Sequence, residues 1–283
     1  MTGMANTPAP HRRLGILERP GCHIHYEVTG SGPAIVFLHG LGGNQLSWWQ
    51  QVAHFARDNT CVTFAARGFA PSSGISAGPD PRHFAGDLEA LIDHLQLKGV
   101  ALVAQSMGGW GAVEYTLSHP GKVAAVVLAA TTGTIDPAQI DGAERARLPH
   151  WLDSSTQAQR ACAEQRVHVA CGARMAREQP ALHLLYKHID DMNAGLDKNA
   201  LRERLGQMRV RAPTDLARIK CPVLFVSGDD DIVIPPFAAD AIARVVPGTR
   251  VAHIADAGHS AYFERAAEFN DLIAGFLRQA MQG

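Results

Sequence analysis

The sequence predicts an α/β protein with a mostly parallel sheet of eight strands, helices on both faces of the sheet, and one long helical insertion. Short apolar runs alternate with helix-compatible stretches along most of the chain, which is typical of a parallel sheet buried on both faces. Strand-like runs disappear between about residues 133 and 213, where helical stretches take over. The length of 283 residues suits one large α/β domain with an inserted subdomain.

The individual elements are predicted from these runs in chain order. The first two strands form an antiparallel pair joined by Pro20-Gly21. Strands are predicted at residues 11–17, 22–28, 34–38, 60–65, 100–104, 123–130, 222–227 and 250–254, and helices near 47–57, 81–96, 107–118, 236–246 and 261–281. The core is therefore predicted to consist of residues 1–132 and 214–283, with the helical insertion at residues 133–213.

Ser106 is the first candidate for chemistry. It follows the apolar run 99–104 and precedes a helix-compatible stretch, and a strand, a sharp turn with serine at its tip and a helix together form a nucleophile elbow. The tight turn needs small neighbours. Gly108 meets this need, and Ala104, where glycine is common, is the smallest residue that carries a Cβ. Such a short motif often occurs by chance, so its partners decide its meaning.

The partners of a nucleophilic serine are a base that takes its proton and an acid that orients the base. Three aspartates, Asp229, Asp230 and Asp231, follow the apolar run 223–226 and the glycine that ends it. His259 follows a glycine after the next apolar run. The 28 residues from Asp231 to His259 leave room for one helix and one strand, which would return the chain to the same sheet edge.

These residues, with the glycine-rich turn after the third strand, resemble the α/β-hydrolase superfamily from about residue 20 to residue 280. The motifs that carry the resemblance are His39-Gly40-Leu41-Gly42-Gly43-Asn44, the Ser106 elbow, Gly228-x-x-Asp231-x-x-x-Pro235 and Gly258-His259. The resemblance implies Ser106 as nucleophile, His259 as base and Asp231 as acid. Asp229 and Asp230 are the alternatives to Asp231, which the spacing of the third motif favours. No cofactor is expected.

The same resemblance implies an oxyanion hole. The backbone N–H groups of Met107, directly after the nucleophile, and of Leu41, in the glycine-rich turn, would stabilise the negative charge that develops on the substrate oxygen. The glycines allow this turn to approach the elbow. His39 is interpreted as a structural residue that holds the loop and does not transfer protons.

Two segments depart from the family pattern. Members often carry Asp-x-Arg-Gly-x-Gly-x-Ser after the fourth strand, whereas this chain has Ala65 in place of the acid and Ala70 in place of the second glycine. The polar network of this loop must therefore differ. Asp136 follows the strand predicted at 123–130, where some members place their acid, but Pro137 comes next, so a helix N-cap is the favoured interpretation.

In this superfamily an insertion at this point forms a lid over the elbow and excludes water. The pocket residues predicted on the insertion are Trp151, Tyr186 and His188, and those predicted near the oxyanion turn are His39, Gly40, Gln45 and Trp48. Packing inside the protein is the alternative for each. The histidines at 168, 183 and 188 do not form a helical i, i+4 pair, so no metal site is predicted.

Composition narrows the classes of function. The net charge of −1 gives no electrostatic basis for binding nucleic acid or an anionic membrane, and no apolar run approaches the ~20 residues of a membrane span. The first 13 residues lack the apolar core of a signal peptide and predict a frayed tail. Five scattered cysteines predict reduced thiols in a cytoplasmic protein. The expected partner is a small-molecule substrate, and a homo-oligomer is left open.

The function predicted from these features is a serine hydrolase that cleaves a small or medium, largely apolar and uncharged carboxylic ester or lactone through an acyl-enzyme. The alternatives on the same triad are carbon–carbon bond hydrolysis, enol-lactone hydrolysis, amide cleavage and the peroxyacid chemistry of cofactor-free haloperoxidases. A receptor that retains the triad is a further alternative, and an inactive scaffold is the last. A haloalkane dehalogenase would need Asp at position 106.

Overall fold

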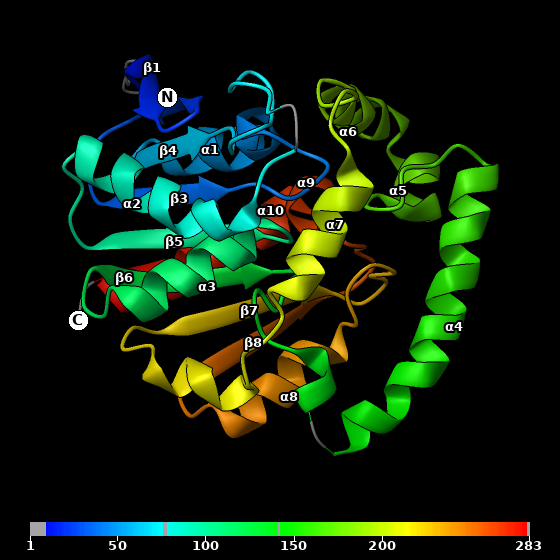
Figure 1. The fold of residues 1–283 in the computed structure, drawn as a ribbon. Helices are drawn as coiled ribbons and strands as arrows, with labels where there is room; N and C mark the ends of the chain where they lie inside the picture. Colours follow the sequence, from blue (N-terminus) through cyan, green and yellow to red (C-terminus); the bar gives the residue numbers. More distant parts are fainter. Residues whose placement is uncertain (1–9, 76–77, 141, 282–283) are drawn as a thin grey trace, which may run out of the picture.

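All eight predicted strands are present in the computed structural model, which describes residues 10–75, 78–140 and 142–281. The frayed tail predicted at the N-terminus lies largely outside these residues. The strands are β1 (Arg12–Arg19), β2 (Cys22–Thr29), β3 (Ala34–Leu38), β4 (Thr60–Phe64), β5 (Val100–Gln105), β6 (Val123–Ala129), β7 (Val223–Gly228) and β8 (Thr249–Ile254). They form one sheet in the order β1-β2-β4-β3-β5-β6-β7-β8 (Figure 1). The strand ends differ from the predicted ones by at most two residues.

The sheet is mostly parallel, as predicted. Strand β2 pairs antiparallel with both β1 and β4, and all later pairs are parallel. The opening hairpin closes at the pair Arg19 and Cys22 around Pro20-Gly21, where Gly21 has the positive φ of +74° that glycine adopts without steric cost.

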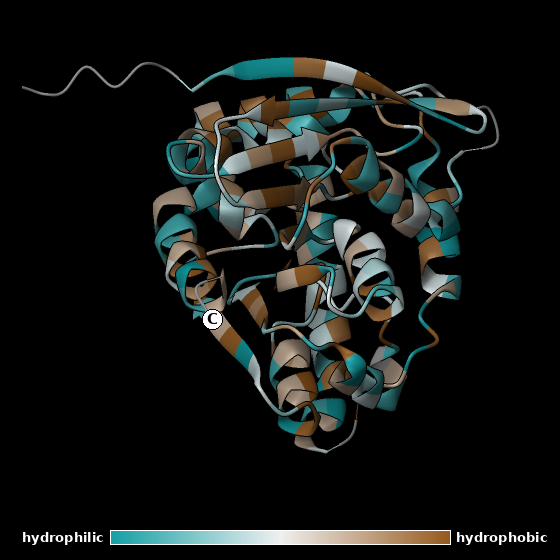
Figure 2. Ribbon diagram, turned by 90° about the vertical axis from the view of Figure 1, so that its left-hand side faces the viewer, coloured by the Kyte–Doolittle hydropathy of each residue, from teal (hydrophilic) through white to brown (hydrophobic). Residues whose placement is uncertain are grey.

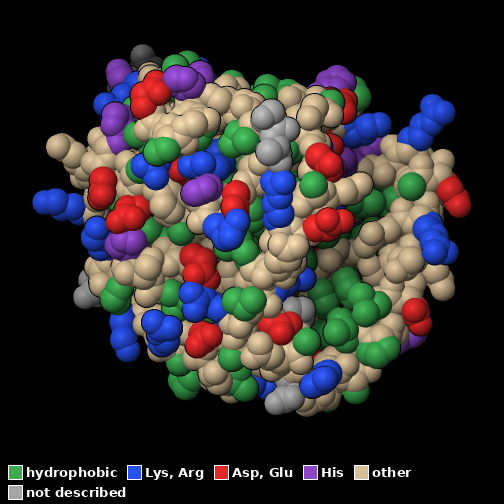
Figure 3. All heavy atoms as spheres, viewed as in Figure 1, with side chains coloured by type: hydrophobic (Ala, Val, Ile, Leu, Met, Phe, Trp, Pro, Cys, Tyr) green, Lys and Arg blue, Asp and Glu red, His purple; other side chains and the backbone are tan. Residues whose placement is uncertain are grey.

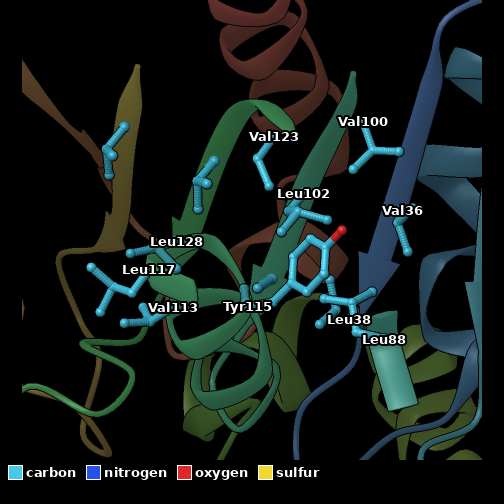
Figure 4. Packing of buried hydrophobic residues seen from close by; sticks show 14 of the residues in the cluster. Val36, Leu38, Leu88, Val100, Leu102, Val113, Tyr115, Leu117, Val123 and Leu128 are labelled. Atoms are coloured by element: carbon cyan, nitrogen blue, oxygen red, sulfur yellow. The ribbon is translucent and has the colours of Figure 1, made fainter. Parts of the chain in front are cut away.

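Helices cover both faces of the sheet because the side chains of each central strand alternate between them. In β3, Val36 and Leu38 pack in one cluster with residues of α2 (Phe84–His94), α3 (Gly108–Ser118) and α8 (Phe237–Val245) (Figure 4). Ile35 and Phe37 pack in a second cluster with residues of α1 (Trp49–Phe55) and α10 (Ala266–Met281). Figure 2 shows the hydrophobic central strands enclosed between the helices. Short helical elements complete the core: η1 (Gln45–Trp48), η2 (Pro81–His83), η4 (Pro213–Arg218) and α9 (Ala261–Glu264).

The segment between β6 and β7 is helical. It contains η3 (Pro137–Gln139), α4 (Ala143–Glu164), α5 (Gly172–Glu178), α6 (Pro180–Asp191) and α7 (Lys198–Gln207). Pro180 opens α6, and Gly195 separates α6 from α7, as helix-breaking residues predict. Pro149 differs, because it lies inside α4 and the helix continues past it. In Figure 1 these helices lie beside one edge of the core, with α4 farthest from the sheet.

Buried polar contacts fasten this insertion to the core. The side chain of Asn193, which follows α6, accepts from the Ala70 N–H at 2.8 Å and donates to the Gly43 carbonyl at 3.2 Å. Ser155 on α4 donates to the Ile232 carbonyl at 2.6 Å. The insertion is therefore held against the loops that follow β3, β4 and β7, at the carboxyl ends of the parallel strands.

Candidate active site

Ser106 occupies a strained turn between β5 and α3. Its φ of +47° lies in the left-handed region, which non-glycine residues adopt mainly where the surrounding structure enforces it. Here the Ser106 N–H donates to the Ala129 carbonyl at the end of β6, 3.0 Å away. Helix α3 packs so closely that a Cβ on Gly108 would lie 2.4 Å from the Leu38 carbonyl oxygen. Ala104 is fully buried in the core cluster, so the alanine before the elbow fits.

The buried pair Asp231–His259 lies at the ends of β7 and β8. Asp231 Oδ2 and His259 Nδ1 are 2.8 Å apart, and the two residues are 3% and 5% exposed. Asp231 Oδ1 accepts the backbone N–H groups of Val233 at 2.7 Å and Ile234 at 3.0 Å. With Nδ1 engaged by the carboxylate, the other ring nitrogen is the one left to accept a proton.

The other aspartates predicted as alternative acids have different partners. Asp229 Oδ1 contacts His253 Nδ1 at 2.9 Å, and Asp230 forms an ion pair with Arg174. Asp136 accepts the Ala138 N–H at 2.9 Å and thereby caps η3. Of the four candidates, the structure brings Asp231 to His259.

The loops that carry the acid and the histidine are fastened to each other through their backbones. A Cβ on Gly228 would lie 2.3 Å from the Gly258 carbonyl oxygen, so no larger residue fits there without displacement. The Asp230 N–H donates to the Ala257 carbonyl at 2.9 Å. The Gly258 N–H donates to the buried carboxylate of Glu264, whose pKa is raised by burial. These contacts fix His259 relative to Asp231.

The glycine-rich turn after β3 lies directly against the elbow. A Cβ on Gly40 would lie 3.2 Å from the Ser106 Cβ. Leu41 and Met107 both line the cavity that contains Ser106. Within the described residues neither backbone N–H has an acceptor, whereas the neighbouring Gly43 N–H donates to the Gly40 carbonyl at 3.1 Å. Two unused donors at this place suit an oxyanion hole.

Gln105 connects the turn, the elbow and the histidine loop. Its buried side chain donates to the His259 carbonyl at 3.2 Å. Its Oε1 lies so near Gly40 that a Cβ there would be 2.0 Å away. Sequence reasoning did not assign Gln105 a role. The position of Gln105 directly before Ser106 does not by itself indicate which backbone groups its side chain contacts.

His39 joins the glycine-rich turn after β3 to the loop after β4. The ring is 2% exposed, and burial lowers its pKa to about 4. The neutral ring donates from Nδ1 to the Gly40 carbonyl at 2.8 Å and accepts the Ala66 N–H at Nε2 at 2.9 Å. Both nitrogens are occupied within the fold, so His39 has no free nitrogen to offer a substrate.

The polar network after β4 uses a carboxylate from another element. Arg67 forms a bidentate pair with Asp87 of α2, with both N–O distances at 2.5 Å, and both residues are buried. Ser72 Oγ donates to the Ala65 carbonyl at 2.7 Å. Asp87 therefore supplies the negative charge that position 65 lacks.

Ser106 and His259 line one cavity of ≈ 530 Å³ between the strand ends and the helical insertion. Figure 3 shows a hollow with hydrophobic side chains between α4 and the body of the molecule. Of the residues predicted for the pocket, Trp151 of α4 and Tyr186 of α6 line this cavity. Further lining residues include Trp110, Thr132, Leu148, Leu152, Asp190, Lys198, Arg202, Leu205, Arg209, Val233 and Ile234.

The remaining residues predicted for the pocket lie elsewhere, and those predictions are corrected. His39 and Gly40 form the support beneath the turn and are not in the cavity wall. Trp48 is fully buried and packs against Phe37 with ring centroids 5.2 Å apart. Gln45 belongs to η1, and His188 lies on the exposed side of α6. Neither is among the lining residues.

The histidines of the insertion are used in local contacts. His183 Nε2 accepts the His168 backbone N–H at 3.1 Å, and His168 Nε2 lies 3.4 Å from an Asp190 carboxylate oxygen. The described residues contain no group of three or more His, Cys, Asp or Glu side chains arranged to hold a metal ion. None of the described helices combines the length and apolarity needed to cross a membrane.

The sheet order, the elbow and the histidine loop define a hydrolase fold, and comparison with known proteins agrees. The chain belongs to the α/β hydrolase fold family, whose model matches residues 33–266. A relative from Mycobacterium tuberculosis carries the provisional name non-heme bromoperoxidase BpoC. It is 28% identical over 268 residues, which span 90% of this chain and 97% of that protein.

Solved structures give the same result for the fold. A thermophilic esterase from Thermogutta terrifontis superimposes with a TM-score of 0.73 and 23% identity, over 96% of this chain and 99% of that one. An N-acyl homoserine lactone degrading enzyme gives a TM-score of 0.72 and 25% identity, over 93% of this chain and all of that one. The chain is therefore an α/β hydrolase with esterases and lactonases among its structural relatives.

Proposed function

We propose that the protein is a serine hydrolase that cleaves a carboxylic ester or lactone through an acyl-enzyme on Ser106. The observation that carries the proposal is the buried pair Asp231–His259, which lies at the wall of the same cavity as a serine held on a strained turn. Esterases and a lactone-degrading enzyme among the relatives support this reaction class.

In the proposed reaction, His259 Nε2 takes the Ser106 proton while the serine oxygen bonds to the substrate carbonyl carbon. Asp231 holds the ring through Nδ1 and stabilises the imidazolium that forms. The N–H groups of Leu41 and Met107 stabilise the oxyanion. The leaving alkoxide departs with the proton from His259, and a water molecule, activated by the same histidine, then hydrolyses the acyl-enzyme. Ordinary ester and lactone hydrolysis needs no cofactor on this route.

Helices α4, α6 and α7 are proposed to act as a lid that covers the reacting carbonyl. Residues from each of them line the cavity together with Ser106. A Cβ on Gly42 of the oxyanion turn would lie 3.1 Å from the Tyr186 hydroxyl and 3.3 Å from Asp190 Oδ1. The lid therefore rests on the turn itself and limits the access of water to it.

The first experiment compares hydrolysis of 4-nitrophenyl esters of increasing acyl length, and of acyl homoserine lactones, by the wild type and Ser106→Ala. Ser118→Ala is the matched control, because Ser118 lies at the far end of α3, the helix that follows Ser106, and its side chain is exposed. We expect activity in the wild type and the control and none above background in Ser106→Ala. Equal activity in all three proteins would exclude Ser106 as nucleophile.

A peroxide-dependent reaction is the second candidate, because a relative at 28% identity carries a bromoperoxidase name. Hydrogen peroxide in place of water would attack the acyl-enzyme and release a peroxyacid and free Ser106. Adding peroxide and a halogenation indicator to the same assay separates the two outcomes. Peroxyacid formation that greatly exceeds hydrolysis would favour this candidate.

A further inference from the structure

The α7 side of the cavity carries a group of cationic side chains. Lys198 and Arg202 belong to α7, and Arg209 follows it, and all three line the cavity. Among the described lining residues, Asp190 is the one carboxylate. The rest of the wall is largely apolar, so the positive charge is concentrated on one side.

Two of these cations already have partners. Lys198 Nζ pairs with Asp190 Oδ1. The Asp190 carboxylate therefore cannot fully neutralise a second cation. Arg202 is exposed to solvent, and its guanidinium donates to Asn199 Oδ1 at 2.7 Å. Neither side chain needs a ligand to satisfy its charge.

Arg209 is different. Its Nε is buried and has no hydrogen-bond partner among the described residues. Burial lowers the pKa of its guanidinium, and the negative charge of Asp136 offsets this effect only in part. No carboxylate of the described residues lies close enough to Arg209 to form an ion pair with it. A buried donor on a charged group that stays unsatisfied is costly.

The guanidinium is nonetheless held in a defined place. It lies over the ring of Trp110, with the Arg209 Cζ atom 5.0 Å from the ring centroid. The Trp110 indole N–H donates to the Leu205 carbonyl at 3.0 Å, which fixes the ring against the end of α7. Trp110 stands in the first turn of α3, four residues after Ser106. A flat, stacked guanidinium is preorganised for a planar anion.

We propose that Arg209 binds a carboxylate on the substrate, so that the preferred substrate is an ester or lactone with a carboxylate remote from the reacting carbonyl. This inference rests on the proposed function and names its substrate class. A single unpaired guanidinium matches a single negative charge and the bidentate geometry of a carboxylate. A phosphate monoester, with a charge of about −1.5 to −2, would leave negative charge uncompensated in this largely apolar cavity. The substrate expected from sequence alone was uncharged, and this cavity wall revises that expectation.

The test uses mono-(4-nitrophenyl) esters of adipate, pimelate and suberate, each compared with the same ester capped at its free end as a neutral methyl ester. In acids of this length the free carboxylate attacks its own ester slowly, and the uncatalysed rate is subtracted. We expect the wild type to prefer the anionic member of at least one pair in kcat/KM. In Arg209→Gln the ratio of anionic to neutral kcat/KM should fall by about 10- to 100-fold, as the loss of a charge-assisted hydrogen bond implies.

Two further variants separate recognition from structure. Arg209→Lys keeps the positive charge but lacks the planar, two-pronged guanidinium, so it should restore part of the preference for the anionic ester. Arg177→Gln makes the same change of charge on α5, outside the cavity lining, where Arg177 pairs with Glu178, and should leave the ratio unchanged. An equal loss on anionic and neutral esters in Arg209→Gln would mean that Arg209 only supports the lid, and it would overturn the inference.

A binding measurement keeps the inference testable if the protein hydrolyses no ester. In Ser106→Ala, calorimetry should detect monomethyl adipate binding more tightly than dimethyl adipate, and adding Arg209→Gln should weaken the binding of the acid by at least about tenfold. This result with an inactive wild type would refute the hydrolase proposal alone. Equal binding of the acid and the diester would refute the carboxylate site alone.

Discussion

Acid should destabilise this protein through His39, the ring that supports the oxyanion turn. Burial lowers the pKa of His39 from 6.5 to about 4. Between these values the unfolded chain binds a proton at this residue and the folded chain does not, so the free energy of unfolding falls as the pH falls. The stabilising contribution is complete above pH 6.5 and is lost as the pH approaches 4. At about 1.4 kcal/mol per pH unit, the contribution amounts to about 3 kcal/mol.

The assay is urea unfolding at several pH values between 7 and 4, on the wild type, His39→Gln and His188→Gln. Glutamine at position 39 does not titrate, so its free energy of unfolding should fall by about 3 kcal/mol less over this range than that of the wild type. His188 is exposed on α6, and its variant should parallel the wild type. His39→Gln also loses hydrogen bonds, which lowers its free energy of unfolding by the same amount at every pH. The test is therefore the difference in slope between the two curves and not their height. Parallel curves for the wild type and His39→Gln would refute the reasoning.

Three more substitutions test other parts of the site. Asp231→Asn should lower kcat by roughly 10⁴ with an unchanged circular dichroism spectrum, because asparagine still accepts the loop N–H groups but favours the wrong histidine tautomer; a loss under tenfold would argue for another acid. Gly108→Ala places a methyl group 2.4 Å from the Leu38 carbonyl oxygen. It should lower the free energy of unfolding by about 1–3 kcal/mol in urea and also reduce activity; an unchanged free energy of unfolding would contradict this packing. Asp87→Ala leaves Arg67 buried without its carboxylate and should lower the free energy of unfolding by about 3–5 kcal/mol; a change below 1 kcal/mol would show that the ion pair contributes little.

The strands and the loops of the site could be predicted from the sequence because they depend on local patterns. A strand buried on both faces must be a continuous apolar run, and β5 and β7 are such runs. Gly108 and Gly228 are required by close backbone approaches that no larger residue permits. The apolar runs can be read without knowledge of the tertiary structure, and the two glycines can be found because each stands at a fixed place in a motif at the end of a strand.

The pocket wall could not be predicted in the same way, because it depends on which face of each helix meets the cavity. Trp48 and Trp110 are both aromatic residues near a motif, yet Trp48 packs into the core and Trp110 lines the cavity. Proline is a helix-breaking residue by type, yet Pro149 lies inside the 22-residue helix α4, which continues past it. Arg209 follows a helix with no motif around it. Its significance comes from its place in the cavity wall, where Asp136 acts on it through its charge but no described carboxylate forms an ion pair with it.

The insertion is fixed at both ends of the site, and this determines how a substrate would be oriented. Ser155 and Gln159 of α4 both donate to the Ile232 carbonyl, at 2.6 Å each, directly after Asp231. Asn193 binds the oxyanion side through the Gly43 carbonyl. The hollow in Figure 3 opens between α4 and the body of the molecule that includes α7.

The α4 side of that hollow contributes apolar side chains, whereas the α7 side contributes the cationic ones together with Leu205. Trp151 and Leu152 lie on α4, whereas Arg202 and Arg209 lie on the α7 side. An ester with an apolar group and a remote carboxylate can satisfy both walls in one orientation only, because the reverse would bury the carboxylate against apolar side chains. The chemistry at the strand ends would accept many carbonyl compounds. We therefore expect the choice among them to follow from this asymmetry of the helical insertion.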